Sequence, residues 1–498
     1  MSKKWLILAV IILMYLPISI DTTVLNIAAP KLSIALSASG NALLWIIDIY
    51  SLVMAGLLLP MGILGDRIGY KRLGIYGLLW FALSSLAAAL ANTIVQLILA
   101  RAALAIGASM VLPATLSAVR KTFTNERQRG IALGIWASVG TTGAAMGPLI
   151  GGWLLTHYYW GSIFLINLPV IAIVLPASWL IMPKQPKCTS QPWSIKQALM
   201  LITAILLLVL AIKHGLCGDG WQTLSAGLIG SFILIVFLRH QLRSPTPILD
   251  LSLFRECVLS TGIIMVIISL MTLVGFELLV AQELQFIHQQ TPFQTGLFMM
   301  PLTLAASICS PLVSWLASVL GLRILSSYGI ALCSLSFFGL SQIDFVDHIK
   351  IAWGWMMLLG FSLQMSLLAS TAAIMSVVPP QKAGAAGAIE GMAYELGAGL
   401  GVAIFGMMLT SGYSATLVLP STLADGLAIQ ATSSINATLQ VAERLNIVEA
   451  DLLRQQAKMA FNQAHSRVLT TSGICLAILT LVVWYCMPTQ RVCSSVQH

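Results

Sequence analysis

Six ionisable side chains interrupt long apolar runs of this 498-residue chain: Asp21, Asp48, Arg101, Glu277, Glu390 and Glu395. A charged group at the centre of a bilayer costs roughly 2.5–3.5 kcal/mol on insertion scales, so those that are retained usually carry ions, protons or substrates. Burial favours the neutral form of a carboxylate, and a nearby arginine favours its anion, so a carboxylate under both influences can bind and release a proton. These residues therefore indicate proton or cation chemistry inside a membrane.

The apolar runs that hold these residues are long enough to be membrane-spanning helices. The chain is 58% hydrophobic and only 9% charged, with a mean hydropathy of +0.92, so lipid must be its solvent. Unbroken runs of about 20 residues favour helices over barrel strands. We expect an all-α membrane protein with about fourteen spans, at 5–29, 43–63, 73–91, 95–117, 131–154, 163–182, 195–213, 222–239, 258–281, 296–317, 324–343, 351–376, 385–410 and 469–487.

Most lysines and arginines lie in the loops that would face the cytoplasm if both termini were cytoplasmic. The net charge of +9 therefore indicates membrane topology and not nucleic-acid binding. A smaller set of lysines and arginines is assigned to the outer side: Lys31, Lys213, Lys350, Arg444, Arg454, Lys458 and Arg467. We expect a multi-pass protein of a bacterial inner membrane, with no cleaved signal.

The span number suggests two six-helix halves with one inserted helix pair. We expect an N-terminal bundle at 1–182, a linker and inserted pair at 183–257, a C-terminal bundle at 258–487 and a cytoplasmic tail at 488–498. Within the C-terminal bundle, the outer polar segment at about 412–465 is compatible with amphipathic helices that cap the outer mouth, or with a flexible loop.

A charged turn, Gly65-Asp66-Arg67-Ile68-Gly69-Tyr70-Lys71-Arg72, separates the second and third spans. It resembles the loop between the second and third helices of major facilitator superfamily transporters. The resemblance implies that Asp66, Arg67 and Arg72 act at an inner gate. The alternative is a positive anchor without a mechanism. In the second half, Gly321-Leu322-Arg323 is weakly similar to this turn but lacks its acid.

Asp21, Asp48 and Arg101 should share one layer, roughly 8–14 Å below the outer helix ends at 1.5 Å per residue. Asp21-Thr22-Thr23 and the run that follows it resemble the first-helix motif of the fourteen-span drug:proton antiporter group, which implies proton coupling by Asp21 with Arg101. A static ion pair of these two residues is the alternative. The run around Arg101 resembles the fourth-helix motif of that family, with Leu104 and Ala105 in place of its usual Gln and Gly.

Trp45-Ile46-Ile47-Asp48-Ile49-Tyr50 is similar to the second span of QacA- and SmvA-type exporters of quaternary ammonium compounds. An acid flanked by Trp45 and Tyr50 could anchor a lipophilic cation through its charge and through cation–π attraction. The alternative is an aromatic belt at the membrane interface with a solvated Asp48.

Two further motifs lie in the fifth and thirteenth spans. Gly143, Gly147 and Gly151 fall at four-residue steps and permit close helix approach, and Pro148 favours a kink. This run resembles the fifth-helix motif of major facilitator antiporters, which implies gating by Gly147 and Pro148 and export over uptake.

The stretch from Glu390 to Gly401 resembles part of QacA-type exporters that bears on cation recognition, which implies substrate-binding roles for Glu395, Glu390 and Tyr394. Glu395 should face Asp48 across the cavity. A hydrogen-bonded structural role is the alternative for Glu390, and for Glu277 we favour it.

No Walker A sequence and no credible HExxH or GxSxG is present, so nothing indicates ATP drive or an enzyme. We expect a monomeric, proton-driven multidrug efflux antiporter that exports quaternary ammonium biocides, dyes and other lipophilic cations, and so confers antimicrobial resistance. Its only coupling ion would be the proton, without cofactor or metal. An exporter of a neutral drug or metabolite is the close alternative, and a membrane-embedded sensor or enzyme is a more distant one.

Overall fold

The computed structural model describes residues 3–183, 194–217, 220–244, 247, 249, 251–378, 383–419 and 425–487. Helices and no strands form the secondary structure of these ranges, and thirteen of the helices are long and apolar enough to cross a membrane. The prediction of an all-α membrane protein is confirmed. Several expected features lie outside the described residues: residues 184–193 at the start of the linker and inserted pair expected at 183–257, the tail 488–498, and the expected inner cations Lys184, Lys187, Lys382 and Arg491.

Seven helices make up the first half: α1 (Lys3–Ala35), α2 (Gly40–Ile68), α3 (Tyr70–Ala89), α4 (Ile94–Thr122), α5 (Glu126–His157), α6 (Ser162–Leu165) and α7 (Asn167–Ile181). Side chains that accept a hydrogen bond from a first-turn N–H set three of the helix starts, at Ser39, Thr93 and Asn125. The α6 and α7 helices together occupy the expected sixth span.

The remaining elements are α8 (Ile195–Cys217), α9 (Gly220–Arg243), a 3₁₀ turn (Leu251–Arg255), α10 (Cys257–Gln282), a π-helical turn (Glu283–Ile287), α11 (Pro292–Ile308), α12 (Ser310–Leu320), α13 (Leu322–Leu340), α14 (Ile349–Val377), α15 (Ala383–Thr416), α16 (Asp425–Thr432), α17 (Ile435–Ala442) and α18 (Ile447–Cys486). The expected span 296–317 is broken at Cys309. Neither α11 nor α12 is long enough alone to count as a span, which explains why thirteen are found and not fourteen.

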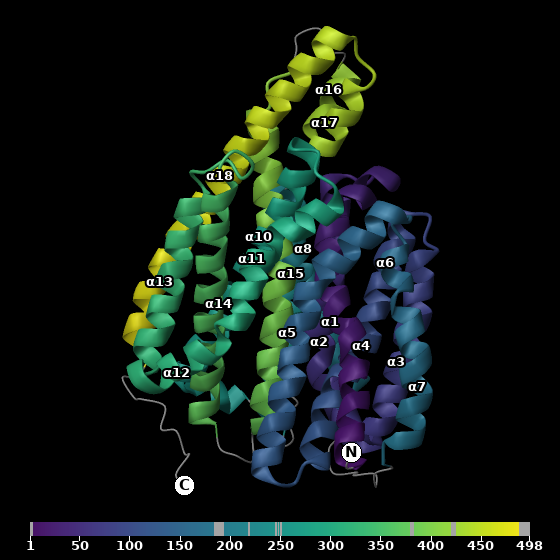
Figure 1. Cartoon of the computed structure of the whole chain (residues 1–498), viewed down its shortest axis with the longest axis vertical. Helices are drawn as coiled ribbons and strands as arrows, with labels where there is room; N and C mark the ends of the chain where they lie inside the picture. The colour runs from purple at the N-terminus through teal and green to yellow at the C-terminus, as the bar shows by residue number, and fades with distance from the viewer. Residues whose placement is uncertain are drawn as a thin grey trace.

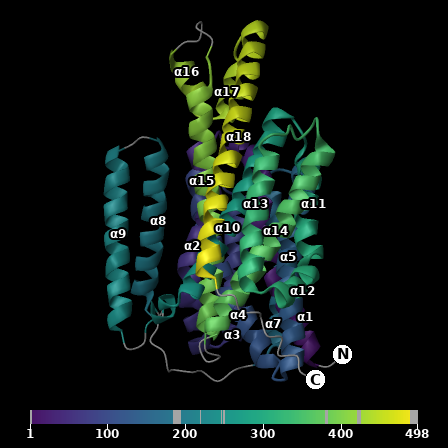
Figure 2. The same ribbon diagram turned by 90° about the vertical axis from the view of Figure 1, so that its left-hand side faces the viewer.

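The helices stand roughly parallel in one bundle (Figure 1). We call the end where α1 begins and the α2–α3 turn lies the base. We call the opposite end, from which α16, α17 and the first part of α18 project, the top. Both ends are seen again in the side view (Figure 2).

Two turns at the base have similar backbone conformations, one in each of the expected halves. Gly69 between α2 and α3 has φ 91°, and Gly321 between α12 and α13 has φ 81°. Residues with a side chain rarely adopt this backbone region, so glycine is needed at both turns. The weakly similar sequence at Gly321 therefore has the same backbone conformation as the charged turn of the first half.

A basic side chain after each of these turns binds the end of the last helix of its own half. Lys71 Nζ donates to the carbonyl of Met182 at 2.6 Å, and Arg323 Nε donates to the carbonyl of Met487 at 2.6 Å. Both acceptors lie just beyond a helix C-terminus, where carbonyls lack intrahelical partners. The two halves thus share a helix-end contact as well as a turn.

The α8 and α9 helices lie in the range expected for the inserted pair, and they stand beside the bundle (Figure 2). The α8 helix packs against α2 of the first half and α15 of the second. Large apolar side chains of α9, among them Trp221 and Phe232, are exposed, as expected for a surface that faces lipid.

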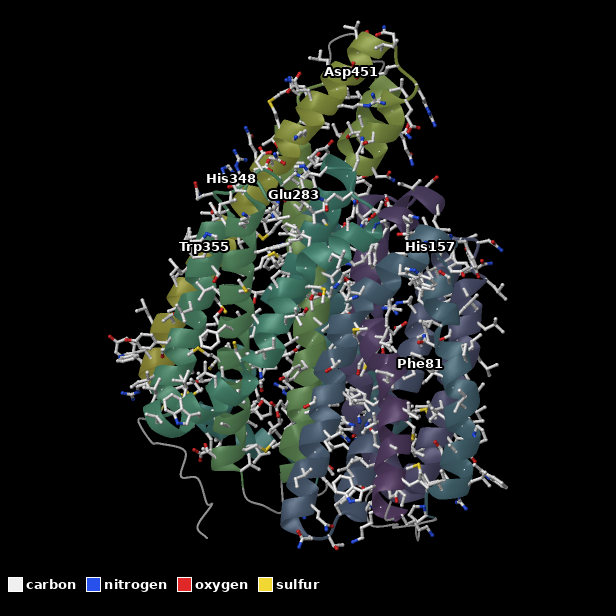
Figure 3. All side chains as sticks on the ribbon, viewed as in Figure 1. Phe81, His157, Glu283, His348, Trp355 and Asp451 are labelled. Atoms are coloured by element: carbon white, nitrogen blue, oxygen red, sulfur yellow. The ribbon has the colours of Figure 1, made fainter. Side chains whose placement is uncertain are left out.

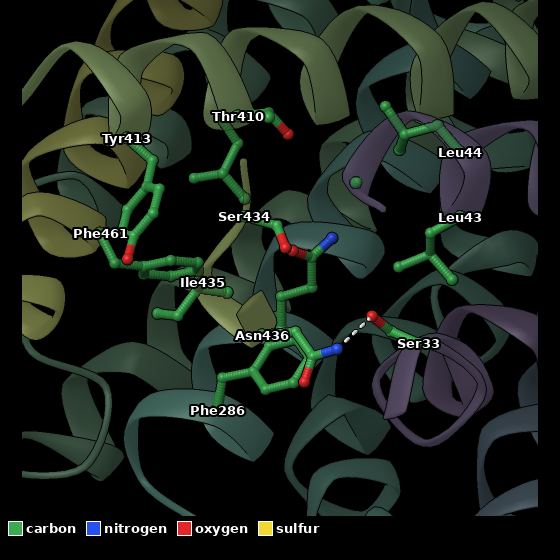
Figure 4. Close-up of a pocket in the computed structure, with 13 residues that line it drawn as sticks. Ser33, Leu43, Leu44, Phe286, Thr410, Tyr413, Ser434, Ile435, Asn436 and Phe461 are labelled. Atoms are coloured by element: carbon green, nitrogen blue, oxygen red, sulfur yellow. Dashed lines mark hydrogen bonds between the residues drawn. The ribbon is translucent and has the colours of Figure 1, made fainter. Parts of the chain in front are cut away.

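The outer polar segment is helical over its described residues, one of the two alternatives expected. The α16 and α17 helices pack beside α18, which continues without a break into the last span (Figure 1). Asn436 Nδ2 donates to Ser33 Oγ at 2.8 Å (Figure 4). The Tyr413 and Thr438 hydroxyls are 2.5 Å apart. These contacts fix the extension, which we define as α16, α17 and the first part of α18, to the top of α1 and α15.

Candidate substrate cavity

A cavity of about 1210 Å³ lies between the halves, lined by residues of α1, α2, α4, α5, α10, α11, α14 and α15. Its lining runs from Glu277 in the upper half of the bundle to Asp66, Arg120 and Lys121 at the base. Asp66 and Lys121 are exposed, so the cavity reaches the surface at the base. This conformation is therefore open toward the base.

Hydrogen bonds between the halves cross the bundle at the upper end of the cavity. Asn26 Nδ2 of α1 donates to Glu277 Oε2 of α10 at 3.0 Å, with both residues buried. Gln285 Nε2 in the π-helical turn donates to the Ile27 carbonyl of α1 at 3.0 Å. The hydrogen-bonded role that we favoured for Glu277 is present, and it links one half to the other.

Two glycines bring α5 and α11 into backbone contact across the same interface. A Cβ added at Gly152 would lie 2.6 Å from the Pro292 carbonyl oxygen. A Cβ added at Gly296 would lie 2.7 Å from the Pro148 carbonyl oxygen. Neither backbone could move aside cheaply, so only glycine allows this close approach. Together with the hydrogen bonds, this contact closes the cavity toward the top.

The glycine face predicted on α5 packs against α1. A Cβ at Gly143 would lie 2.7 Å from Ser19 Cβ, and one at Gly147 or Gly151 would overlap the side chains of Thr23 or Val24. Thr23 Oγ1 also donates to the Ala144 carbonyl at 2.8 Å. The expected close helix approach is confirmed; a gating role for Gly147 and Pro148 is still a prediction.

Asp21 and Arg101 form a buried ion pair beside the cavity. Arg101 Nη1 lies 2.6 Å from Asp21 Oδ2, and both side chains are at most 2% exposed. The guanidinium also lies 4.5 Å from the centre of the Tyr50 ring. Arg101 lines the cavity, and Asp21 lies behind it. The shared layer is as predicted, and the ion pair that we considered as an alternative is formed in this conformation.

Asp48 has a partner that the sequence did not suggest. Lys213 Nζ of α8 lies 2.7 Å from Asp48 Oδ2, and both side chains are at most 1% exposed. The same ammonium lies 3.8 Å from the centre of the Trp45 ring. The assignment of Lys213 to an outer loop was wrong. It sits near the end of an apolar run, where a charge resembles a span boundary, but the helix continues past it.

The carboxylates of α15 both face the cavity. Glu395 lies beside Ser51 of α2, and its Oε2 atom is buried without a hydrogen-bond partner among the described residues. Glu390 accepts a hydrogen bond from the Thr371 hydroxyl of α14. Tyr394 also lines the cavity. Asp48 and Glu395 belong to the same cavity, as expected, but Lys213 already neutralises Asp48.

The charged turn at the base is mostly exposed. Asp66 Oδ1 lies 4.0 Å from Lys121 Nζ of α4, with 63% and 44% of the two side chains exposed. Arg67 and Arg72 are exposed as well. This ion pair joins two helices of one half, so it does not itself hold the halves together in the base-open conformation. The gating role of the turn is still a prediction.

A polar cluster that the sequence did not suggest lies near the top of the second half, around Glu283 (Figure 3). His465 Nδ1 of α18 contacts Glu283 Oε2, and His288 Nε2 lies 3.8 Å from Glu283 Oε1. The histidines are far apart in the sequence, so no spacing signals the cluster. It joins α18, where the extension meets the bundle, to the π-helical turn after α10.

Comparison with known proteins agrees with this architecture. Residues 11–402 match the Major Facilitator Superfamily, so the chain belongs to this family of membrane transporters. It is 49% identical to the methyl viologen resistance protein SmvA of Salmonella typhimurium, over 97% of this chain and 98% of that protein. It is 32% identical to the multidrug efflux pump LfrA of Mycolicibacterium smegmatis, over 96% and 95% of the respective chains.

A solved structure shares the fold at low sequence identity. It is a bacterial homologue of the human lysosomal transporter Spinster in an inward-facing and unoccupied conformation, with a TM-score of 0.70 and 16% identity. The similarity covers 97% of this chain and 98% of that one. This similarity shows the fold, and the family match and the relatives show that the chain is a transporter and not an enzyme.

Proposed function

We propose that this transporter exports lipophilic cations, such as quaternary ammonium biocides and dyes, from the cytoplasm in exchange for protons. The observation that supports this proposal most is the Glu395 carboxylate, which faces a large cavity with one buried oxygen that has no hydrogen-bond partner among the described residues. Arg101, a cation whose charge acts on Glu395, is already paired with Asp21. A lipophilic cation loses hydration when it enters the cavity. The Glu395 carboxylate could pair with the cation and so replace part of that lost hydration.

The direction of transport is supported by the charges at the base. Exposed basic residues gather there, including Lys4, Arg67 and Arg72. Basic residues favour the cytoplasmic side of a membrane, so the base-open cavity would load from the cytoplasm of a bacterial inner membrane. The names of the relatives, a methyl viologen resistance protein and a multidrug efflux pump, agree with export.

The coupling step would use the Asp21–Arg101 pair. A proton that binds Asp21 from the outer side neutralises it and releases Arg101, which lines the cavity. Binding of a proton to Asp21 would then weaken binding of the cation, because the freed Arg101 repels a cation that lies near Glu395. Each inward proton supplies about 2.3 kcal/mol per 100 mV, and each outward monocation consumes the same amount. A one-for-one exchange is therefore driven by the pH gradient and the substrate gradient, and a second proton per cycle would add the membrane potential. We propose that the monomer is sufficient for this cycle.

The test is export of tetraphenylphosphonium and of an uncharged dye from the same cells, with and without a protonophore. Glu395→Gln should lower export of the cation by at least about tenfold, or about 1.4 kcal/mol, relative to the dye. Glu443→Gln, an exposed glutamate of the extension, is the matched control. Equal losses for the two substrates would contradict cation recognition by Glu395, and export of the dye alone would favour a neutral substrate.

A further inference from the structure

Lys213 is the unusual residue of the inserted pair. The α8 helix stands at the edge of the bundle, and neighbouring side chains such as Ile212 are exposed. Lys213 is nevertheless only 1% exposed and lies in a helix apolar enough to cross a membrane. A lysine in such a helix would ordinarily extend toward the membrane surface. Here the ammonium instead points inward, toward α2.

The ammonium occupies a site that has the features of a cation receptor. Asp48 Oδ2 lies 2.7 Å from it, and the Trp45 ring covers it at 3.8 Å. Asp48 and Trp45 are three residues apart and therefore share one face of α2. A carboxylate combined with an aromatic face is the arrangement that recognises organic cations. The acid and the Trp45 ring that the sequence suggested for cation binding do lie together, and in this structure a lysine of the same protein contacts both of them.

Asp48 separates this site from the cavity. It lines the cavity together with Ser51, next to Glu395, whereas Lys213 approaches from the α8 side and does not line it. A cation in the cavity and Lys213 would therefore compete for one carboxylate. While Lys213 is paired with Asp48, that acid contributes little net charge to the cavity.

We infer that Lys213 is a specificity-determining residue, an internal counter-cation that withholds Asp48 from cations in the cavity. This inference rests on the proposed function. Without Lys213, Asp48 would offer a second carboxylate near Glu395, so a substrate with two positive charges would gain more than a substrate with one. Lys213 thus limits the preference of the transporter for dications.

The experiment measures binding of methyl viologen, a dication, and of tetraphenylphosphonium, a monocation, to the purified full-length protein in nanodiscs. In Lys213→Met we expect affinity for methyl viologen to rise about tenfold relative to that for tetraphenylphosphonium, or about 1.4 kcal/mol, because the freed Asp48 carboxylate can pair with its second charge. In the double variant Lys213→Met/Asp48→Asn the gain should vanish. Lys196→Met, an exposed lysine of the same helix, should bind like the wild type.

Lys213→Gln is the second variant, for use if Lys213→Met does not fold. It removes the positive charge, but its amide can still donate a hydrogen bond to Asp48. Equal changes for the two ligands, no change, or a gain that persists without Asp48 would overturn the inference. Failure of both variants to fold would also overturn it, and would show that Lys213 is a structural tie between α8 and α2. If the wild type binds neither cation, the proposed function fails as well.

Discussion

The backbone contact between α5 and α11 should control how readily the top of the transporter opens. Gly152→Ala places a methyl group 2.6 Å from the Pro292 carbonyl oxygen and 2.8 Å from Phe293 Cα. These are backbone atoms, so α5 and α11 must separate to accept the methyl group. Overpacking of this kind costs about 1–3 kcal/mol. Because the contact joins the two halves, only the top-closed conformation bears that cost.

The ratio of top-open to top-closed molecules should therefore rise about 5- to 150-fold, at 1.4 kcal/mol for each factor of ten. Alanine also favours a helix over glycine by about 1 kcal/mol. That gain applies to both conformations and does not change their ratio. Gly134→Ala in the same helix is the matched control, since nothing lies within 4 Å of a Cβ added there.

Spin labels at His157 of α5 and Leu297 of α11 would report the separation of the two helices at the top, in a variant without the native cysteines. Both positions are exposed. We expect a second, longer distance in Gly152→Ala, and none in Gly134→Ala. The reasoning is refuted if Gly152→Ala folds and keeps the wild-type distance distribution, because the glycine contact would then not hold the top closed.

Three other substitutions test separate parts of the structure. Asp21→Asn should keep the fold but abolish substrate-triggered proton release in vesicles, and undiminished release would remove Asp21 from the coupling step. Asp66→Ala should increase labelling of engineered cysteines in the cavity from the base side, and unchanged labelling with normal export would leave the turn as an anchor. Gly321→Ala should lower the free energy of unfolding, measured in thermal melts, by about 1–3 kcal/mol, because a φ of 81° strains any residue with a side chain. Gly354→Ala is the control and should show no such loss, since the methyl group would enter open space.

Much of the fold could be predicted because lipid leaves few choices to the chain. Length and hydropathy located the helices, and the rise per residue placed Asp21 and Arg101 in one layer, where they are 2.6 Å apart. The four-residue steps of Gly143, Gly147 and Gly151 likewise predicted one packing face. These features follow from local sequence and from helix geometry alone.

The parts that sequence did not reveal depend on contacts between distant segments. Lys213 meets Asp48 only because α8 packs against α2, and no local pattern encodes that packing. His465 and Glu283 meet through the continuation of α18 above the last span. The break at Cys309 was missed because the apolar run continues through it.

The length of α18 has a practical consequence for imaging. Forty residues at about 1.5 Å each give a helix of about 60 Å, roughly twice the hydrocarbon thickness of a bilayer. About half of this helix, braced by α16 and α17, therefore stands outside the detergent micelle or nanodisc. Small transporters without such a projection are hard to orient in electron micrographs. Here the extension supplies an asymmetric landmark for particle alignment and an epitope for antibody fragments.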